Sequence, residues 1–110
     1  MEADAQNLYE RRWALDLLDH VLDRLRHEAV ASGKGAVFHQ LQGCLLGEHR
    51  TETYAQLGAR LGLSETAVKV TVHRLRQRYR ELLREQIAHT VTRPEEIDDE
   101  MRYLFEVVSR

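Results

Sequence analysis

The 110-residue chain has 43% hydrophobic and 31% charged residues, a mean hydropathy of −0.52 and a formal charge of −2, which suits one compact domain. Its longest uncharged stretch, residues 35–47, contains His39 and two glutamines, so a membrane-spanning helix is excluded. Glu2 and Asp4 stand where a signal peptide would carry lysines, and Cys44 is the only cysteine. We therefore expect a cytoplasmic protein without disulfides.

Helical periodicity dominates the sequence, and we expect an all-α fold: a helix-turn-helix domain preceded by a helical hairpin and followed by a C-terminal helix. The hairpin occupies residues 1–50. Its first helix is predicted from about Ala5 to Val30, and its second from about Ala36 to Leu46, closed by Gly47. The apolar stripe expected on the first helix is Leu8, Leu15, Leu18, Leu22, Leu25 and Ala29. The inward residues expected on the second are Val37, Phe38, Leu41 and Leu45.

The central segment, residues 51–91, matches the helix-turn-helix pattern, in which the second helix enters the DNA major groove. Thr53 and Gln56 predict a capping box for a short helix over Tyr54–Leu61. Gly62-Leu63 breaks that helix, and Ser64 is expected to cap a longer one over Glu65–Thr90. The apolar residues expected on the inner surface are Leu57, Leu61, Leu63, Val68, Val72, Leu75, Tyr79 and Leu82.

The C-terminal segment, residues 92–110, is acidic and amphipathic. Pro94 suits a first helical position, so we predict a helix over Pro94–Val108. Its apolar stripe is Ile97, Met101, Leu104, Phe105 and Val108. Two interpretations stay open: the stripe completes the domain's own core, or the helix covers the basic face or docks a partner.

Charge is segregated along the chain. Residues 1–49 carry a net −3, residues 50–90 a net +4, and residues 91–110 a net −3. The basic centre favours a polyanion partner, although a solvated helix face braced by opposite charges would look similar. Candidates for reading DNA base edges, from the first turns of the long helix, are Thr66, Lys69, Val70, His73 and Arg74. Candidates for holding phosphates are Arg60, Arg76, Gln77, Arg78 and Arg80.

The run from Thr53 to Arg84 resembles region 4 of the extracytoplasmic-function sigma factors, the promoter-specificity subunits of bacterial RNA polymerase. The similar parts are the opening Tyr-Ala-Gln-Leu-Gly-Ala, the turn Leu-Gly-Leu-Ser and the helix motif Ala-Val-Lys-Val-Thr-Val-His-Arg-Leu-Arg. Gly58 stands where the family usually has alanine, and Val70-Thr71 where many members have Ser-Arg.

The resemblance implies a DNA-binding protein of transcription initiation that reads the −35 promoter element. Lys69, Val70, His73 and Arg74 would occupy the positions that face bases. It also implies contact with the β flap of RNA polymerase, and an anti-sigma factor as a further partner. Neither membrane attachment nor a cofactor is implied.

Sigma factors of this family carry a promoter-melting region before region 4, and residues 1–50 are too few to supply it. We therefore expect the chain to be a C-terminal part of a longer sigma factor, with a stand-alone regulator as the alternative. Two other classes stay open. One is a helical protein-interaction domain, and the other is a dimeric helix-turn-helix regulator that pairs through its N-terminal helices.

Other candidate sites are weaker. One helix face carries four possible metal ligands, two aspartates and two histidines. Only pairs of them have ligand spacing and no residue from another element converges on them, so we interpret the face as solvated. Cys44 is expected to be a small buried side chain, and Trp13 a packing anchor or a partner contact. No nucleophile grouping or glycine-rich loop supports catalysis, so an enzyme is not expected. The four residues are Asp16, His20, Asp23 and His27.

Overall fold

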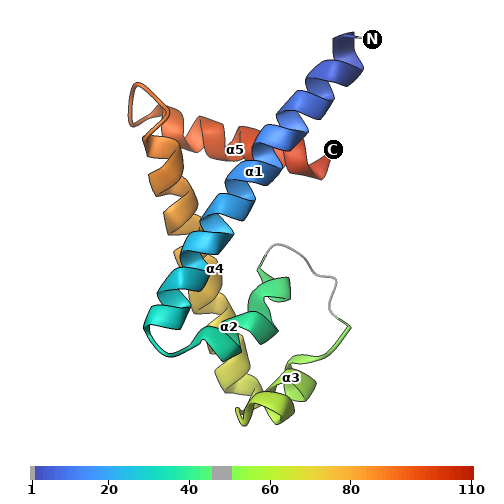
Figure 1. The fold of residues 1–110 in the computed structure, drawn as a ribbon, viewed down its shortest axis with the longest axis vertical. Helices are drawn as coiled ribbons and strands as arrows, with labels where there is room; N and C mark the ends of the chain where they lie inside the picture. Colours follow the sequence, from blue (N-terminus) through green and yellow to red (C-terminus); the bar gives the residue numbers. More distant parts are fainter. Residues whose placement is uncertain (1, 46–50) are drawn as a thin grey trace. The chain divides into compact units, whose positions relative to one another are not determined.

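The computed structural model describes residues 2–45 and 51–110. In chain order these residues form α1 (Glu2–Ala31), α2 (Gly35–Leu41), the 3₁₀ helix η1 (Gln42–Cys44), α3 (Tyr54–Leu61), α4 (Glu65–Ala88) and α5 (Glu96–Ser109) (Figure 1). No strand occurs in these two ranges, so the all-α prediction is confirmed. Within the same ranges, no helix combines the length and the apolar character that crossing a membrane requires.

The chain divides into two compact units, where the sequence suggested one. The first unit comprises Met1–Asp23 and Glu81–Arg110, and the second comprises Arg24–Arg80. The boundaries fall inside α1 and α4, because each of these long helices has different neighbours along its two halves. The consecutive segments 1–50, 51–91 and 92–110 stay a prediction about the organisation of the sequence.

The first unit has an apolar core to which α1, α4 and α5 contribute. α5 buries Met101, Leu104 and Val107 in this core, which agrees with the first of the two interpretations of this segment. The other residues of the predicted stripe, Ile97, Phe105 and Val108, are only partly buried. Trp13 packs edge-on against Tyr103 at 5.6 Å between ring centroids, as a packing anchor. The other core side chains of this unit are Ala14, Leu18 and Val21 of α1 and Leu82, Leu83 and Ile87 of α4.

The apolar stripe predicted for α1 is partly wrong. Leu8 is 69% exposed and Leu15 is 42% exposed, whereas Ala14 and Val21 are fully buried. Leucines at intervals of three, four and seven are compatible with two neighbouring stripes on one helix. The small Ala14 permits close approach of another helix, so packing uses the stripe that runs through it.

The end of the second helix differs from the prediction for a local reason. The second helix was expected to continue as α-helix to Leu46, but it tightens into η1 after Leu41. Gly43 lies in η1, where its weak helix propensity opposes a regular α-helix and a short 3₁₀ turn is a common ending. Leu46 and the expected closing residue Gly47 lie outside the described residues.

The start of the last helix also differs from the prediction, because α5 begins at Glu96 and not at Pro94. The N–H groups of Glu96 and Ile97 donate to the carbonyls of Arg93 and Pro94 at 3.0 and 3.1 Å. These bonds span three residues, so Pro94 belongs to a tight turn that leads into the helix. The preceding helix, α4, ends at Ala88, two residues before the predicted Thr90.

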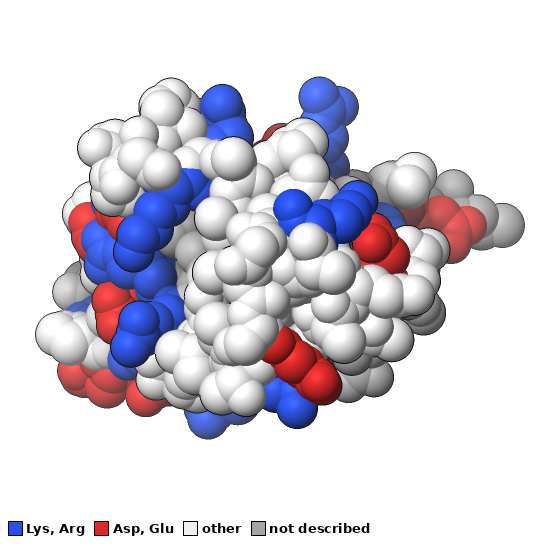
Figure 2. All heavy atoms as spheres, turned by 90° about the horizontal axis from the view of Figure 1, so that it is seen from below, with Lys and Arg blue, Asp and Glu red and all other residues white. Residues whose placement is uncertain are grey.

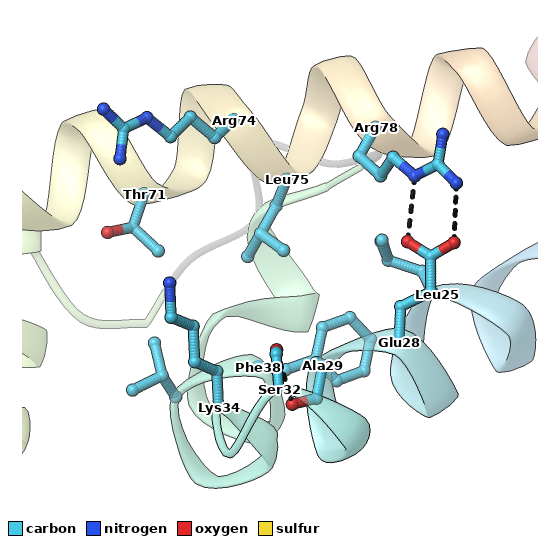
Figure 3. Close-up of a pocket in the computed structure, with 11 residues that line it drawn as sticks. Leu25, Glu28, Ala29, Ser32, Lys34, Phe38, Thr71, Arg74, Leu75 and Arg78 are labelled. Carbon is cyan, nitrogen blue, oxygen red and sulfur yellow. Dashed lines mark hydrogen bonds and ion pairs between the residues drawn. The ribbon is translucent and has the colours of Figure 1, made fainter.

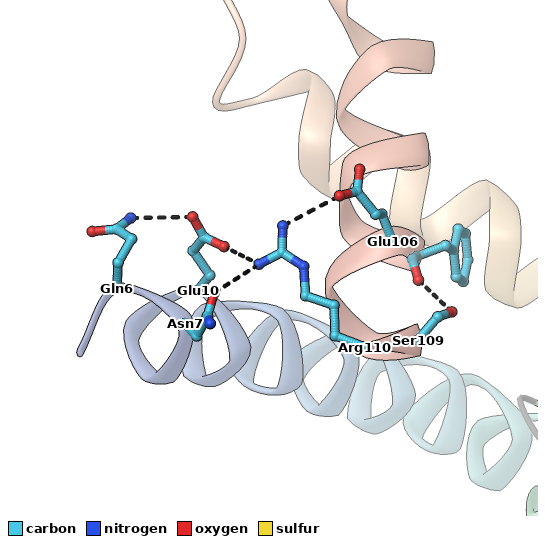
Figure 4. A network of polar contacts seen from close by, with 7 residues as sticks. Gln6, Asn7, Glu10, Glu106, Ser109 and Arg110 are labelled. Carbon is cyan, nitrogen blue, oxygen red and sulfur yellow. Dashed lines mark hydrogen bonds and ion pairs between the residues drawn. The ribbon is translucent and has the colours of Figure 1, made fainter. Parts of the chain in front are cut away.

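A polar network ties the C-terminus of α5 to the start of α1 in the first unit (Figure 4). The Arg110 guanidinium donates to Glu10, to Asn7 Oδ1 at 3.3 Å and to Glu106 Oε1 at 3.2 Å. Gln6 Nε2 donates to Glu10 Oε1 at 3.2 Å. Hydrogen bonds from Gln6, then from Tyr103 and Arg110, lower the pKa of Glu10 below its usual value of 4.5.

We expect this network to make the stability of the chain acid-sensitive. A carboxylate whose pKa is lower in the folded state stabilises that state above its unfolded pKa, and the contribution is lost as the pH falls through the folded pKa. Urea unfolding at pH 7, 5, 4 and 3 should therefore show that Glu10→Gln loses stability at pH 7 but has a flatter decline on the acid side than the unmodified chain. Parallel pH profiles for the two proteins would contradict this.

Candidate nucleic-acid interface

The short helix α3 of the second unit begins with the predicted capping box. Gln56 N–H donates to Thr53 Oγ1 at 3.1 Å, and Thr53 N–H donates to Gln56 Oε1 at 2.8 Å. The extended backbone of Thr53 (φ −76°, ψ 163°) brings its side chain back over the first turn. Because two otherwise unpaired N–H groups are satisfied reciprocally, the start of α3 is fixed at Tyr54.

α3 is joined to α4 by a tight turn in which the backbone of Leu63 lies close to Gly58. Gly62 adopts φ +70°, a left-handed conformation that costs glycine little, and ends α3. Leu63 N–H donates to the Gly58 carbonyl at 2.8 Å. A Cβ on Gly58 would lie only 2.4 Å from the Leu63 carbonyl oxygen. The turn therefore requires a residue without a side chain at position 58, where the sigma-factor pattern usually has alanine.

The cap predicted for α4 is also present, since Ala67 N–H donates to Ser64 Oγ at 3.1 Å. Beneath the turn, Val68 and Val72 of α4 are buried against Leu57 of α3. Cys44, expected to be a small buried side chain, is buried in the same core beside Leu41. Partly buried residues packed around this core are Val37, Tyr54, Leu61, Leu63 and Leu75. The core thus fixes which side of α4 faces outward.

The outward side of the first turns of α4 carries all five candidates for reading base edges. Val70 is 42% exposed, whereas Val68 and Val72 of the same helix are buried. Lys69 lies 3.4 Å from Glu65 one turn earlier, in an exposed pair of the kind that contributes little to stability. The exposed candidates are Thr66, Lys69, Val70, His73 and Arg74. Figure 2, which views the α3 end of Figure 1, shows Lys and Arg in separate groups and not as one continuous basic patch.

Arg78, one of the phosphate candidates, is held by a carboxylate. Its Nε and Nη2 donate to the two Glu28 oxygens at 2.8 and 2.6 Å, a bidentate pair that links α4 to the end of α1 (Figure 3). The hydrogen bond from Arg78 is the main cause that lowers the pKa of Glu28 below 4.5. Glu28 lies 50 residues before Arg78 in the sequence, so this pair depends on the packing of two distant segments.

The other phosphate candidates differ in how they are held. Arg76 Nε donates to the Cys44 carbonyl at 2.9 Å, so its side chain caps η1. Arg60 lies 2.8 Å from Glu52. Gln77 and Arg80 are exposed, and within the described residues no carboxylate pairs with Arg80. The five candidates are thus not equivalent, because Arg60, Arg76 and Arg78 already make contacts with other parts of the second unit.

Lys34, which the sequence pattern did not single out, belongs to a groove of about 390 Å³ in the second unit. Figure 3 shows its side chain extending from the loop before α2 toward Thr71 of α4, while Arg74 extends along α4 away from the Glu28 pair. Within the described residues neither Lys34 nor Arg74 has an ionic partner. Apolar side chains that line the groove are Leu25, Ala29, Val37, Phe38 and Leu75. No local pattern marks Lys34, because its place depends on the packing of α2 against α4.

The candidate metal ligands on α1 do not form a site in the structure. In the parts of the chain that are described, no group of three or more His, Cys, Asp or Glu side chains is placed to hold a metal ion. Asp16, His20, Asp23 and His27 are all exposed.

Comparisons of the chain with protein-family models, with curated proteins and with solved structures find no match. Function is therefore inferred from the residues and the geometry described above.

We expect Gly58→Ala to destabilise the turn. The added methyl group meets a backbone oxygen that cannot move without displacing the α3–α4 junction, at a cost of about 1–3 kcal/mol. The gain in helix propensity offsets only about 0.5–1 kcal/mol of this. Urea unfolding should show a net loss of about 1–2 kcal/mol.

Gly43→Ala is the matched control, because a Cβ at that position has no neighbour within 4 Å. We expect it to leave the free energy of unfolding unchanged or slightly raised. Equal stability of the two variants would show that the close approach at Gly58 does not constrain the turn.

Proposed function

We propose that this chain is a sequence-specific DNA-binding module that reads a promoter through the first turns of α4. The observation that carries the proposal is the capped α3–turn–α4 unit with Thr66, Lys69, Val70, His73 and Arg74 exposed together on its outward side. A helix presented in this way by a helix-turn-helix unit fits the major groove. The resemblance to region 4 of the extracytoplasmic-function sigma factors makes the −35 element the proposed target.

The five outward residues suit base recognition for different reasons. Arg74 can donate two hydrogen bonds to guanine, and Lys69 can donate to the same acceptors. The exposed Val70 can pack on a thymine methyl group. Arg80 and Gln77, farther along α4, suit phosphates, which fix the register of the helix without selecting a sequence.

The proposed action is binding and not catalysis. By the sigma-factor resemblance, DNA-bound α4 would recruit RNA polymerase through its β flap, and an anti-sigma factor would oppose this. Such a protein would act in the cytoplasm, where transcription takes place. The few cationic side chains available for phosphates favour modest, salt-sensitive affinity for an isolated module.

The test begins with a pool of randomised DNA duplexes, from which the chain should enrich one sequence. Arg74→Ala and Lys69→Ala should each weaken binding to the enriched duplex by about 1–3 kcal/mol and relax its selectivity. Arg80→Ala should weaken binding to all duplexes alike and reduce the salt dependence by about one phosphate contact. Fluorescence anisotropy at several salt concentrations measures both effects.

Arg102→Ala is the control, because Arg102 is an exposed arginine of α5 in the other unit. It should bind DNA like the unmodified chain. If no sequence is enriched and binding shows no salt dependence, the helical protein-interaction domain becomes the better interpretation. Enrichment of a palindromic sequence would favour the dimeric regulator.

Removal of the Glu28 carboxylate should strengthen DNA binding. Glu28 pairs with Arg78 at 2.6 Å, and Glu28→Gln removes the negative charge of this pair from the neighbourhood of α4. We expect tighter binding to both enriched and scrambled duplexes, with a steeper salt dependence. The double variant Glu28→Gln/Arg78→Gln should lose this gain, and if it keeps the gain, Arg78 is not the cause.

A further inference from the structure

A row of leucines on α1 in the first unit is not used by the core. Leu8 and Leu15 are 69% and 42% exposed, and Leu22 is only partly buried. The three leucines are seven residues apart, so they lie on one side of the helix, about 10.5 Å from one to the next. Seven-residue spacing of leucine is typical of a seam between two helices.

Charges flank this leucine seam symmetrically. Arg11 lies four residues before Leu15, and Asp19 lies four residues after it. Both side chains are exposed, and within the described residues neither has a hydrogen-bond or ion-pair partner. Arg12, beside Arg11, has only an exposed contact of 4.0 Å with Asp16. The centre of the seam at Leu15 is therefore preceded by basic side chains and followed by an acidic one.

We propose that a second copy of this chain binds to the seam, with its own α1 antiparallel and Leu15 on the twofold axis. Antiparallel pairing about Leu15 brings Leu8 of each copy opposite Leu22 of the other. It also brings Asp19 of each copy, about 6 Å from the axis, to the level of Arg11 and Arg12 of the other. Each copy thus supplies basic partners for Asp19 of the other copy, and the same contacts occur twice, as in any isologous interface.

The same charges disfavour the parallel arrangement. In-register parallel helices would place Arg11 beside Arg11 and Asp19 beside Asp19, and like charges across a helix seam are repulsive. A second copy carries the complementary charges, Arg11 and Asp19, at the required distances from Leu15, whereas a protein of unrelated sequence has no reason to carry them. One helix from each copy makes a small interface, so weak and reversible association is expected. This proposal does not depend on DNA binding.

The experiment is sedimentation equilibrium of the full chain over about 5–500 µM, compared with Arg11→Asp and Asp19→Arg. Either variant alone places like charges together twice in its own dimer, so each should associate about tenfold more weakly than the unmodified chain. In an equimolar mixture, the introduced aspartate of one variant lies opposite the introduced arginine of the other, and the unchanged Asp19 and Arg11 also face each other. The mixture should recover association to within about threefold of the unmodified chain.

Two leucine-seam controls complete the test. Leu15→Glu should abolish association, whereas Tyr9→Glu should preserve it, because Tyr9 is 72% exposed but lies on another side of α1. Far-UV circular dichroism should show the same helix content for every variant. A monomer throughout the concentration range would overturn the proposal. Failure of the mixture to recover, or loss of association in Tyr9→Glu, would also overturn it.

Discussion

The helix-turn-helix of this chain depends on one close backbone approach, between Gly58 of α3 and the Leu63 carbonyl in the turn. A Cβ at position 58 would meet that oxygen at 2.4 Å, so a side chain there would have to shift the observed junction of the two helices. The junction sets Val68 and Val72 against Leu57. Since the buried side of α4 is then determined, the outward side is determined as well. The orientation of the proposed recognition surface therefore depends on the absence of a side chain at Gly58.

The arginines of α4 have two different tasks. Near the middle of the helix, Arg76 donates to the Cys44 carbonyl and Arg78 pairs with Glu28, so these side chains hold η1 and the end of α1 against α4. Arg74, one turn earlier than Arg78, has no ionic partner among the described residues. A basic helix therefore cannot be treated as a uniform phosphate-binding surface. Charges bound internally must be released before they bind DNA, whereas exposed unpaired charges are available at once.

Local signals in the sequence predicted local structure well, because their causes lie within a few residues. The capping pair Thr53 and Gln56, the break of α3 at Gly62 and the cap Ser64 all occur as predicted. The pairing of Arg78 with Glu28 and the place of Lys34 in the groove were not predictable, because both depend on helices that are distant in sequence. The exposure of the outward α4 residues followed from the periodicity of the buried ones, but their DNA contacts stay a prediction.

The incorrect stripe on α1 shows what periodicity can and cannot determine. Spacing of three, four and seven predicts that leucines share a side of a helix, and it does so correctly for Leu8, Leu15 and Leu22. It does not determine whether the partner of that side belongs to the same molecule. The core of the first unit uses Leu18 of that stripe together with Ala14 and Val21, and it leaves Leu8 and Leu15 of the leucine seam exposed. Since Arg11 and Asp19 are arranged about its centre to complement an identical helix, the seam is better explained as the interface of a dimer than as a defect of the core.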